Sequence, residues 1–426
     1  MKNLFKKIKQ LAKEGLFHIF GSSVIAKVGG IISSVVVIRN LPKAAYGSYV
    51  DAENLYAYAA IFIGLGISSA MIQYCCENIT EQRRTALYSF SLKFGMLGNF
   101  LLLPVILAMA AVKYLSGAEL QAQYLAMLSF LPFFAYADQY LQLVLRVKRK
   151  NALFARTNML YTATYVGGNI VLTLIWGVPG LIVSQYVAHV AATLHSAWVL
   201  REEDFFRPVL TTGERLERKD RRDYLSYSLI CAVTNFASTA LVLLDVTCLS
   251  IVLGDTEVLA DYKVASTVPM ALAFVTKNLA TFYYPKLVQA FSDGKKRGFS
   301  ELKQMGKLSA MINGGIFVGL ILFAPLIVWI LYGDRYMNVV PIFRILSINY
   351  LMDAARNITG NTIAVLRKVK VNLAFSVLSG VLKIGLNVWL ITSRGSVGAA
   401  LATLAVTICI VVLNTAYLWR YYKKSE

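Results

Sequence analysis

The side chains in this sequence that are most able to do chemistry are charged groups inside long apolar runs. Eight are basic (Lys27, Lys93, Arg156, Lys263, Lys277, Arg344, Arg356 and Lys383) and five are acidic (Asp51, Glu53, Asp138, Asp245 and Asp353). At about 2.5–3.5 kcal/mol each, thirteen charges facing lipid would cost roughly 30–45 kcal/mol. That cost exceeds the stability of an ordinary fold. We therefore expect most of them to face a water-filled cavity, to pair with one another or to reach an interface.

The depth of each charge separates these roles. Asp51, Lys93 and Arg156 lie near the ends of their runs, so an interfacial position is as plausible as a cavity. The deepest charges are Lys27, Asp245, Asp353, Arg356 and Lys383. Asp353 and Arg356 are three residues apart and can pair along one helical face, either as a stabilising pair or as part of a substrate site.

Lys27 has no oppositely charged neighbour at helical spacing, which makes it the strongest single candidate for a cavity. His189 and His195 share one apolar run and have no metal-ligand spacing. For both histidines, packing or an interfacial position is favoured over proton transfer.

Motifs for most other chemistries are missing. The sequence contains no P-loop, no H-E-x-x-H, no Gly-x-Ser-x-Gly and no paired cysteines. The five cysteines show no metal or disulfide spacing. No loop on the expected outer side exceeds a handful of residues, so an enzyme active site is not expected. No cofactor is predicted, and coupling to a proton gradient, a sodium gradient or the membrane potential is left open.

Composition defines the elements that must position these charges. The chain has 426 residues, of which 57% are hydrophobic and only 15% charged. Its net charge of +20 is spread over short clusters between apolar runs, which argues against nucleic-acid binding. Each run is long enough to cross about 30 Å of hydrocarbon as a helix. We expect spans at 17–38, 48–73, 86–112, 119–145, 152–175, 178–200, 224–250, 257–285, 307–331, 337–365, 371–391 and 396–419.

These spans predict an all-α polytopic membrane protein with about twelve transmembrane helices in two six-helix lobes. Residues 17–200 would form the first lobe and 224–419 the second, joined by a cytoplasmic linker at 201–223 and followed by a cytoplasmic tail at 420–426. Residues 1–16 alternate Lys with apolar residues and predict an amphipathic helix on an anionic leaflet. Alternate loops contain 30 and 5 Lys and Arg residues, so the basic loops and both termini are predicted to be cytoplasmic.

The chain also repeats itself. VLRVKRKNALF at 144–154 is echoed by VLRKVKVNLAF at 365–375, which is an offset of 221. A second echo has an offset of 218 and pairs Asn169, Gly177, Gly180 and Ser184 with Asn387, Gly395, Gly398 and Ala402. Six spans per half would make this a parallel repeat, with a cleft between the lobes.

A family resemblance rests on short motifs distributed along the chain. RNLPKAAYGSY at 39–49 precedes a run containing Gly64-Leu-Gly66, and LGDTEVLADYKVA at 253–265 is its counterpart in the second half. With the helix number and the Asn-x(7)-Gly-x(2)-Gly turns, the chain resembles polysaccharide flippases (O-antigen, Wzx-type) of the multidrug/oligosaccharidyl-lipid/polysaccharide exporter superfamily.

The resemblance implies a flippase for undecaprenyl-pyrophosphate-linked oligosaccharide in a bacterial plasma (inner) membrane, working by alternating access in O-antigen, lipopolysaccharide or other surface-polysaccharide biosynthesis. Polysaccharide polymerase machinery is an implied partner. An excess of cations in the cavity would lower the barrier for a pyrophosphate. We therefore expect substrate binding by Lys27, Lys263, Arg344, Arg356 and Lys383, and coupling or gating by Asp51, Glu53, Asp138, Asp245 and Asp353.

Aligning Tyr49 with Tyr262, at an offset of 213, places Lys263 opposite Asp51 and Glu53. These residues are predicted to form a weak gate on the outer side. The alternatives are a cation-coupled multidrug exporter, for which the cationic excess is unfavourable, a peptidoglycan-precursor flippase, and a membrane enzyme acting on polyprenyl-linked sugars. The glycan, the coupling ion and the oligomeric state do not follow from the sequence.

Overall fold

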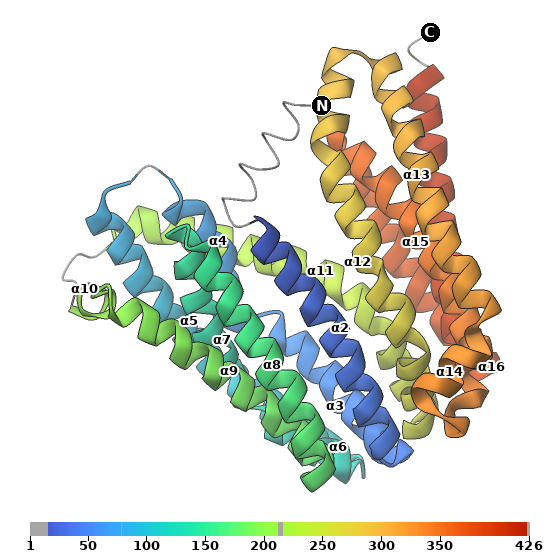
Figure 1. Cartoon of the computed structure of the whole chain (residues 1–426), viewed down its shortest axis with the longest axis horizontal. Helices are drawn as coiled ribbons and strands as arrows, with labels where there is room; N and C mark the ends of the chain where they lie inside the picture. The colour runs from blue at the N-terminus through green and yellow to red at the C-terminus, as the bar shows by residue number, and fades with distance from the viewer. Residues whose placement is uncertain (1–15, 78, 212–215, 424–426) are drawn as a thin grey trace. The chain divides into compact units, whose positions relative to one another are not determined.

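The structure is a computed structural model that describes residues 16–77, 79–211 and 216–423 (Figure 1). Within these ranges every regular element is a helix. The expected all-α polytopic membrane fold is therefore confirmed. The amphipathic helix predicted at 1–16 lies outside the described residues, apart from the first residue of α2.

The chain forms two compact units, Met1–Leu243 (unit 1) and Leu244–Glu426 (unit 2). The boundary falls inside helix α11 (Arg218–Leu253), about three turns before its end. The linker expected from the sequence, at 201–223, lies before this boundary and overlaps the first six residues of the helix. The first turns of α11 pack with unit 1, because Tyr224 belongs to the hydrophobic core formed there with Tyr88, Tyr136 and Tyr140.

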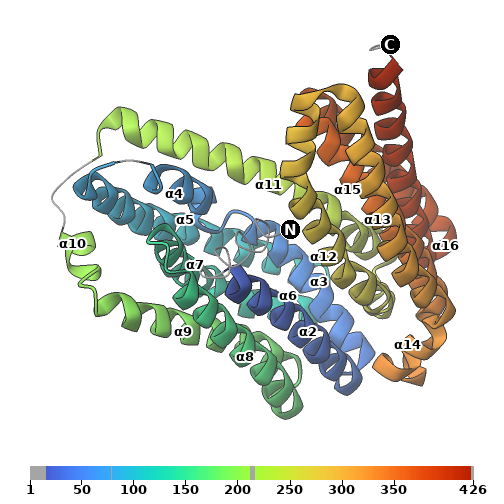
Figure 2. The same ribbon diagram turned by 45° about the horizontal axis from the view of Figure 1, so that its top comes forward.

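The helices of unit 1 that precede α11 follow the expected spans closely. They are α2 (Leu16–Asn40), α3 (Lys43–Ala60), η1 (Ile63–Gly66), α4 (Ile67–Cys75), α5 (Glu81–Leu115), α6 (Glu119–Leu128), α7 (Leu131–Val147), α8 (Asn151–Trp176), α9 (Val178–Arg201) and the short α10 (Phe206–Thr211). Figures 1 and 2 both show α8 and α9 side by side.

The second span is broken where α3 meets α4. Gly64, Leu65 and Gly66 all have positive φ, and the freed N–H of Gly64 donates to Asn99 Oδ1 at 3.1 Å. A Cβ at Gly64 would overlap the Tyr136 ring. The two glycines therefore allow both the reversed backbone and the close packing of Tyr136.

Unit 2 comprises the end of α11 and five long elements or pairs of elements. They are α12 (Thr256–Asp293), α13 (Lys295–Leu322) with α14 (Ala324–Tyr332), η2 (Asp334–Val339) with α15 (Val340–Val365), and the two arms of α16 (Val369–Lys423). Helix α16 reverses direction at Gly395, which has φ 58°. In a continuous helix, residues 390 and 398 would be about 12 Å apart. A Cβ at Gly398 would instead lie 2.0 Å from the carbonyl oxygen of Leu390, so the chain folds back on itself here.

Each of the twelve expected spans thus coincides with a helix, a broken helix or one arm of α16. Among the described residues, six helices meet a strict test of length and apolar composition for crossing a membrane, or seven if the bent α11 counts as one span. The six are 43–75, 81–115, 151–176, 256–277, 295–322 and 370–423. The last contains both arms of α16.

The backbone fixes the register of the internal repeat. Gly177 (φ 66°, ψ −138°) and Gly395 (φ 58°, ψ −137°) have the same unusual conformation, and they form one of the pairs at offset 218. A Cβ at Gly180 would lie 1.9 Å from the carbonyl oxygen of Leu172, which matches the close approach at Gly398. The echo at offset 218 is therefore structural.

The alignment of the two basic segments at an offset of 221 is wrong by three positions. Arg149 and Arg367 have φ of 57° and 58° and occupy equivalent turns, and their offset is again 218. Helices α8 and α16 then begin at Asn151 and Val369, which have the same offset. Both turns are rich in Lys and Arg, so similar letters can be aligned in more than one register, and only the backbone distinguishes the registers.

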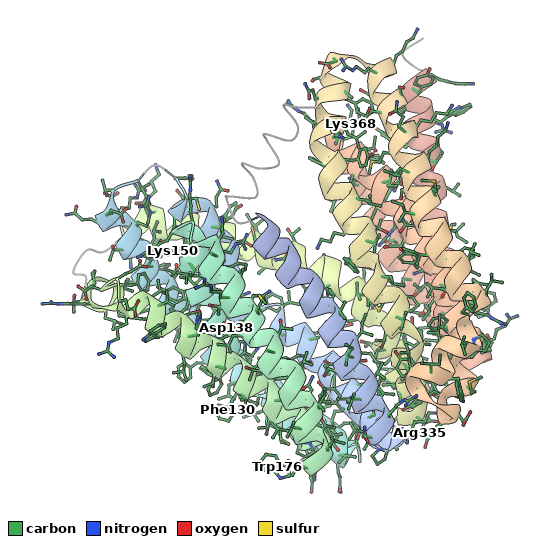
Figure 3. All side chains as sticks on the ribbon, viewed as in Figure 1. Phe130, Asp138, Lys150, Trp176, Arg335 and Lys368 are labelled. Carbon is green, nitrogen blue, oxygen red and sulfur yellow. The ribbon has the colours of Figure 1, made fainter. Side chains whose placement is uncertain are left out.

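In unit 1 the basic loops converge at one end. Glu203 pairs with Lys148 (3.0 Å) and with Lys150, and Arg83 pairs with Asp220 (3.0 Å). Burial lowers the pKa of Lys148, although the nearby Glu81 opposes this shift. Figure 3 shows Lys150 and Trp176 near opposite ends of the unit, with Asp138 between them.

Unit 2 is arranged in the same way. Lys295 lies 4.6 Å from the centroid of the Tyr421 ring, and Phe299 packs on Tyr422, so the turn after α12 meets the end of α16. Figure 3 places Lys368 and Arg335 near opposite ends of this unit. Within each unit, the loops expected on one side of the membrane therefore lie together.

Candidate functional site

Three of the five acidic residues expected inside the membrane are buried, with 3–5% of their surface exposed: Asp51, Asp138 and Asp245. Each has a basic or imidazole partner in its own unit. The partners are Lys113 for Asp51 (2.6 Å), His189 for Asp138 (3.1 Å) and Lys383 for Asp245 (3.1 Å). A buried carboxylate requires such a partner, because an isolated charge in a low-dielectric interior is very costly.

The network around Asp245 is the most complete. Its Oδ1 accepts from Asn387 Nδ2 at 3.0 Å, and its Oδ2 accepts from Tyr262 OH and Thr403 Oγ1, both at 2.8 Å. The same Oδ2 pairs with Lys383 Nζ. Helices α11 and α12 and both arms of α16 are thereby joined through one carboxylate. Sequence analysis assigns Asp245 to coupling and Lys383 to substrate, but the structure places them in a single buried network.

Unit 1 has a related network without the ion pair. Asn169, equivalent to Asn387, donates to Ser33 at 3.0 Å and accepts from Ser184. Gln185, equivalent to Thr403, donates to Tyr49 OH at 2.9 Å. Asn169 hydrogen-bonds to Ser33, whereas its counterpart Asn387 hydrogen-bonds to Asp245. Ser33 of unit 1 therefore occupies the position that Asp245 has in unit 2.

The register at offset 218 also relates Lys383 to Tyr165. Tyr262 corresponds to Tyr49 at an offset of 213. The first residues of α3 and α12 are related by the same offset. One unit therefore uses an Asp–Lys pair where the other uses hydroxyl groups.

The pair of Asp138 and His189 connects α7 with α9. Gln142 Nε2 donates to Asp138 Oδ1 at 2.7 Å, and His189 Nδ1 lies 3.1 Å from Asp138 Oδ2. The His189 ring packs on Tyr161 of α8, with centroids 4.9 Å apart. Sequence analysis did not find this pair, because its members belong to different helices and are far apart in the chain.

At the end of unit 1 opposite the basic loops, Asp51 of α3 pairs with Lys113 of α5. Glu53 is half-buried and accepts a hydrogen bond from Tyr49 at 3.3 Å. The gate predicted between Lys263 and Asp51 or Glu53 would join residues of different units and stays a prediction. Asp51 already has a cationic partner within unit 1.

On α15, Arg356 Nε donates to Asp353 Oδ1 at 2.8 Å, and Asn357 donates to Oδ2 of the same carboxylate at 2.9 Å. The spacing of three residues therefore does bring these charges together. Both side chains remain partly exposed, at 43% for Arg356 and 24% for Asp353.

The remaining basic residues in the spans differ from the acids in exposure. Lys263 is half-buried, whereas five others are exposed: Lys27, Lys93, Arg156, Lys277 and Arg344. In the described part of the chain, no group of three His, Cys, Asp or Glu side chains could hold a metal ion. The accessible charge of the spans is therefore mainly cationic.

Sequence reasoning missed several members of these networks. Lys113 is assigned there to a loop, and Tyr262 and Asn387 serve only as markers of the repeat. Thr403 and Gln142 are not considered. Their one sequence signal is that they are polar side chains within apolar runs. In hydrocarbon such groups must find hydrogen-bonding partners inside the protein.

Solved structures of similar fold are known. An inward-facing multidrug resistance MATE family transporter of the MOP superfamily matches 94% of this chain and 95% of its own, with a TM-score of 0.73 and 14% identity. The lipid II flippase MurJ, in an inward closed conformation, matches 94% of this chain and 87% of its own, also with a TM-score of 0.73 and 14% identity. The protein therefore has the fold of this class of multi-pass membrane transporters.

The sequence identifies the family within this class. The model of the family described as polysaccharide biosynthesis protein matches residues 12–291, and the chain belongs to that family. A probable low-salt glycan biosynthesis flippase, Agl15 of Haloferax volcanii, is 25% identical over 265 residues. This match covers 62% of the chain and 54% of the relative, so the chain spans about half the length of that protein.

Proposed function

We propose that the protein is a flippase that moves a lipid-linked oligosaccharide from the cytoplasmic to the outer leaflet for the synthesis of a surface polysaccharide. Membership of the polysaccharide biosynthesis family, over residues 12–291, carries this proposal. The likeness to a probable glycan biosynthesis flippase supports the same substrate class. The protein would act as a transporter and not as an enzyme.

The charge distribution favours an anionic cargo. Asp51, Asp138 and Asp245 each have a cationic or imidazole partner, whereas five basic residues within the spans are exposed. A pyrophosphate linkage carries negative charge into the bilayer, and exposed Lys and Arg side chains would lower the cost of its passage. Undecaprenyl pyrophosphate, bearing an O-antigen or a related oligosaccharide, is the carrier that we propose.

The proposed cycle is alternating access in a bacterial plasma membrane, with both termini in the cytoplasm. The division into two compact units and the internal repeat support such a cycle, since transporters built from repeats commonly move one half against the other. The convergence of the basic loops within each unit supports the proposed orientation.

Deletion of the gene tests the function. Cells that lack it should accumulate lipid-linked oligosaccharide on the cytoplasmic side, and mass spectrometry of the extracted lipid would identify the glycan. The intact gene should restore export when supplied in trans. Normal surface polysaccharide in the deletion strain, together with raised sensitivity to cationic drugs, would contradict the proposal and favour a drug exporter.

Reconstitution tests transport directly. Purified protein in liposomes should move a labelled polyprenyl-pyrophosphate oligosaccharide between leaflets, and the same polyprenyl chain without the pyrophosphate should move far more slowly. Equal rates for the two lipids would contradict the assignment of the exposed bases to pyrophosphate binding.

A further inference from the structure

The Asp138–His189 pair differs in chemistry from the pairs that Asp51 and Asp245 form. Asp51 and Asp245 have lysine partners, and the ordinary pKa of a lysine side chain lies well above the physiological range. The partner of Asp138 is a histidine, the side chain that ordinarily changes its charge between pH 5 and 8. Of these three acids, Asp138 is thus the one whose partner can gain or lose a proton in that range.

The pair lies deep within unit 1. His189 is eleven residues from the start of α9 and twelve from its end, so it lies about 17 Å from each end. Asp138 has 4% of its surface exposed, whereas the His189 side chain retains 17%. The imidazole is therefore the more exposed member of the pair.

Hydrogen bonds determine which nitrogen takes the proton. When Asp138 is ionised, its carboxylate only accepts hydrogen bonds, and His189 Nδ1, at 3.1 Å from Asp138 Oδ2, is then the N–H donor. The neutral ring then has its lone pair on Nε2. Gln142 holds the other carboxylate oxygen at 2.7 Å, which keeps Oδ2 directed at the ring.

Proton binding changes the net charge of this buried pair. With a neutral ring the pair carries a net charge of −1, and with an imidazolium ring it carries none. A proton from water that binds Nε2 therefore replaces an uncompensated buried charge with an ion pair, and its release reverses the change. No bond other than the N–H bond forms or breaks.

Other titratable groups lie near the pair on α8, α9 and α3. Tyr161 of α8 is within electrostatic reach of Asp138, and Tyr56 of α3 interacts in turn with Tyr161 and with Tyr186 of α9. Glu53 of α3 is more distant and acts on Tyr165, which stacks on Tyr161.

The faces that α4 and α5 present to α7 contain small or neutral groups. Ser68 bonds to Gln139, and Ser91 and Gly95 contact Tyr136. The tyrosines stay neutral in the relevant pH range.

We propose that Asp138 and His189 form a proton-binding site that couples glycolipid movement to a proton gradient. The coupling rests on the proposed function, whereas proton binding itself does not. A proton entering from the outer side would neutralise the pair, and its release to the cytoplasm would restore the charged form. Each cycle could then be driven by one proton moving inward as the glycolipid moves outward.

Proton binding can be measured without transport. The chain has three histidines, and replacing His18 and His195 by Gln leaves His189 as the only imidazole. Its ring nitrogen resonances should change from neutral to charged between pH 5 and 9 in lipid nanodiscs. A ring that keeps one protonation state throughout would overturn the proposal.

Coupling is measured in liposomes with labelled polyprenyl-pyrophosphate oligosaccharide. An imposed proton gradient should accelerate movement several-fold in the wild type. The same acceleration is expected in His195→Gln, a control on α9 whose ring bonds to Thr157 of α8. The gradient effect should be lost in His189→Gln and in Asp138→Asn. It should also be lost in His189→Lys. This variant keeps a positive charge beside Asp138, so its loss of the gradient effect would not reflect misfolding caused by an unpaired carboxylate.

The outcomes separate the two hypotheses. Movement by the wild type that ignores the gradient overturns the coupling while the flippase assignment stands. An absence of movement by the wild type under any condition overturns the flippase assignment, and the resonance titration still decides whether the pair binds a proton.

Discussion

Lys383 determines whether the core of unit 2 is electrically balanced. Its ammonium group lies 3.1 Å from Asp245, and both side chains are buried. Breaking such a pair by removing one partner leaves an unpaired charge in a low-dielectric interior, whereas removing both charges is often tolerated.

We expect Lys383→Met to destabilise the protein by about 3–5 kcal/mol. The double variant Lys383→Met with Asp245→Asn should recover most of that loss, since the remaining groups can still hydrogen-bond. Thermal unfolding in detergent measures both effects. Lys93→Met, at an exposed position of α5, is the control and should unfold near the wild-type temperature. Equal stability of Lys383→Met and the wild type would show that the pair is not important for folding.

Lys27 is the residue that we expect to attract the pyrophosphate. It is exposed on α2 and lies about 17 Å from the start of that helix. Lys27→Ala should abolish glycan export at normal protein levels, and Lys27→Arg should retain part of it, because the positive charge is preserved. Surface polysaccharide in a complemented deletion strain is the measure. Arg156→Ala, near the start of α8, should have the milder effect, and wild-type export by Lys27→Ala would refute the assignment.

The sequence indicates most of the charged residues in these networks, but not their partners. A charge inside an apolar run is visible at once, which is why Asp138, Asp245 and Lys383 were found. The partners of these charges lie on other helices, far away along the chain, and helix packing decides which of them meet. Among the charges expected within the spans, Asp353 and Arg356 are three residues apart, and local spacing predicts the pair that they form.

At the level of helices, the turn after α8 and the equivalent turn within α16 rely on close contact between backbones. Gly180 and Gly398 each bring the chain so near a carbonyl oxygen that a Cβ would lie 1.9–2.0 Å away. Gly167 and Gly385, which are also equivalent in the repeat, have nothing within 4 Å of a Cβ. The repeat thus supplies two test positions and two matched controls.

We expect Gly180→Ala and Gly398→Ala each to destabilise the fold by about 1–3 kcal/mol, because helices must move apart to admit the methyl group. Gly167→Ala and Gly385→Ala should be neutral or stabilising by up to about 1 kcal/mol, since alanine favours the helix. Unfolding temperatures of the four variants provide the comparison. If all four behaved alike, the close approach at the turns would be unimportant.

Helix positions followed from sequence because a membrane demands long apolar runs and leaves few alternatives. The interruption within the second span could not be predicted from the sequence. The interruption at 61–66 depends on Gly64 fitting against Tyr136 and bonding to Asn99, contacts made across three helices. The reversal within α16 was expected, because its Asn-x(7)-Gly-x(2)-Gly spacing repeats that of the turn at Gly177.

For the whole molecule, the basic loops predict which ends of the helices face the cytoplasm. Single cysteines at Arg218 and Thr256, the first residues of α11 and α12, should be labelled from opposite sides of the membrane in a cysteine-free background. A membrane-impermeant maleimide added to intact cells should reach only the cysteine at 256. Labelling of both sites from outside would contradict the span assignment. The compact units themselves were predictable from the repeat, although their boundary inside α11 was not.

The paired arginines Arg149 and Arg367 show what this architecture requires of its turns. Both adopt a left-handed backbone that costs an L-residue roughly 1–2 kcal/mol and that glycine would adopt freely. Under the proposed orientation, a cation there adds to the charge that would keep the loop in the cytoplasm as the chain is inserted. Both halves have the same strained residue at this turn, and the proposed orientation gives that residue a role in insertion that glycine would not have.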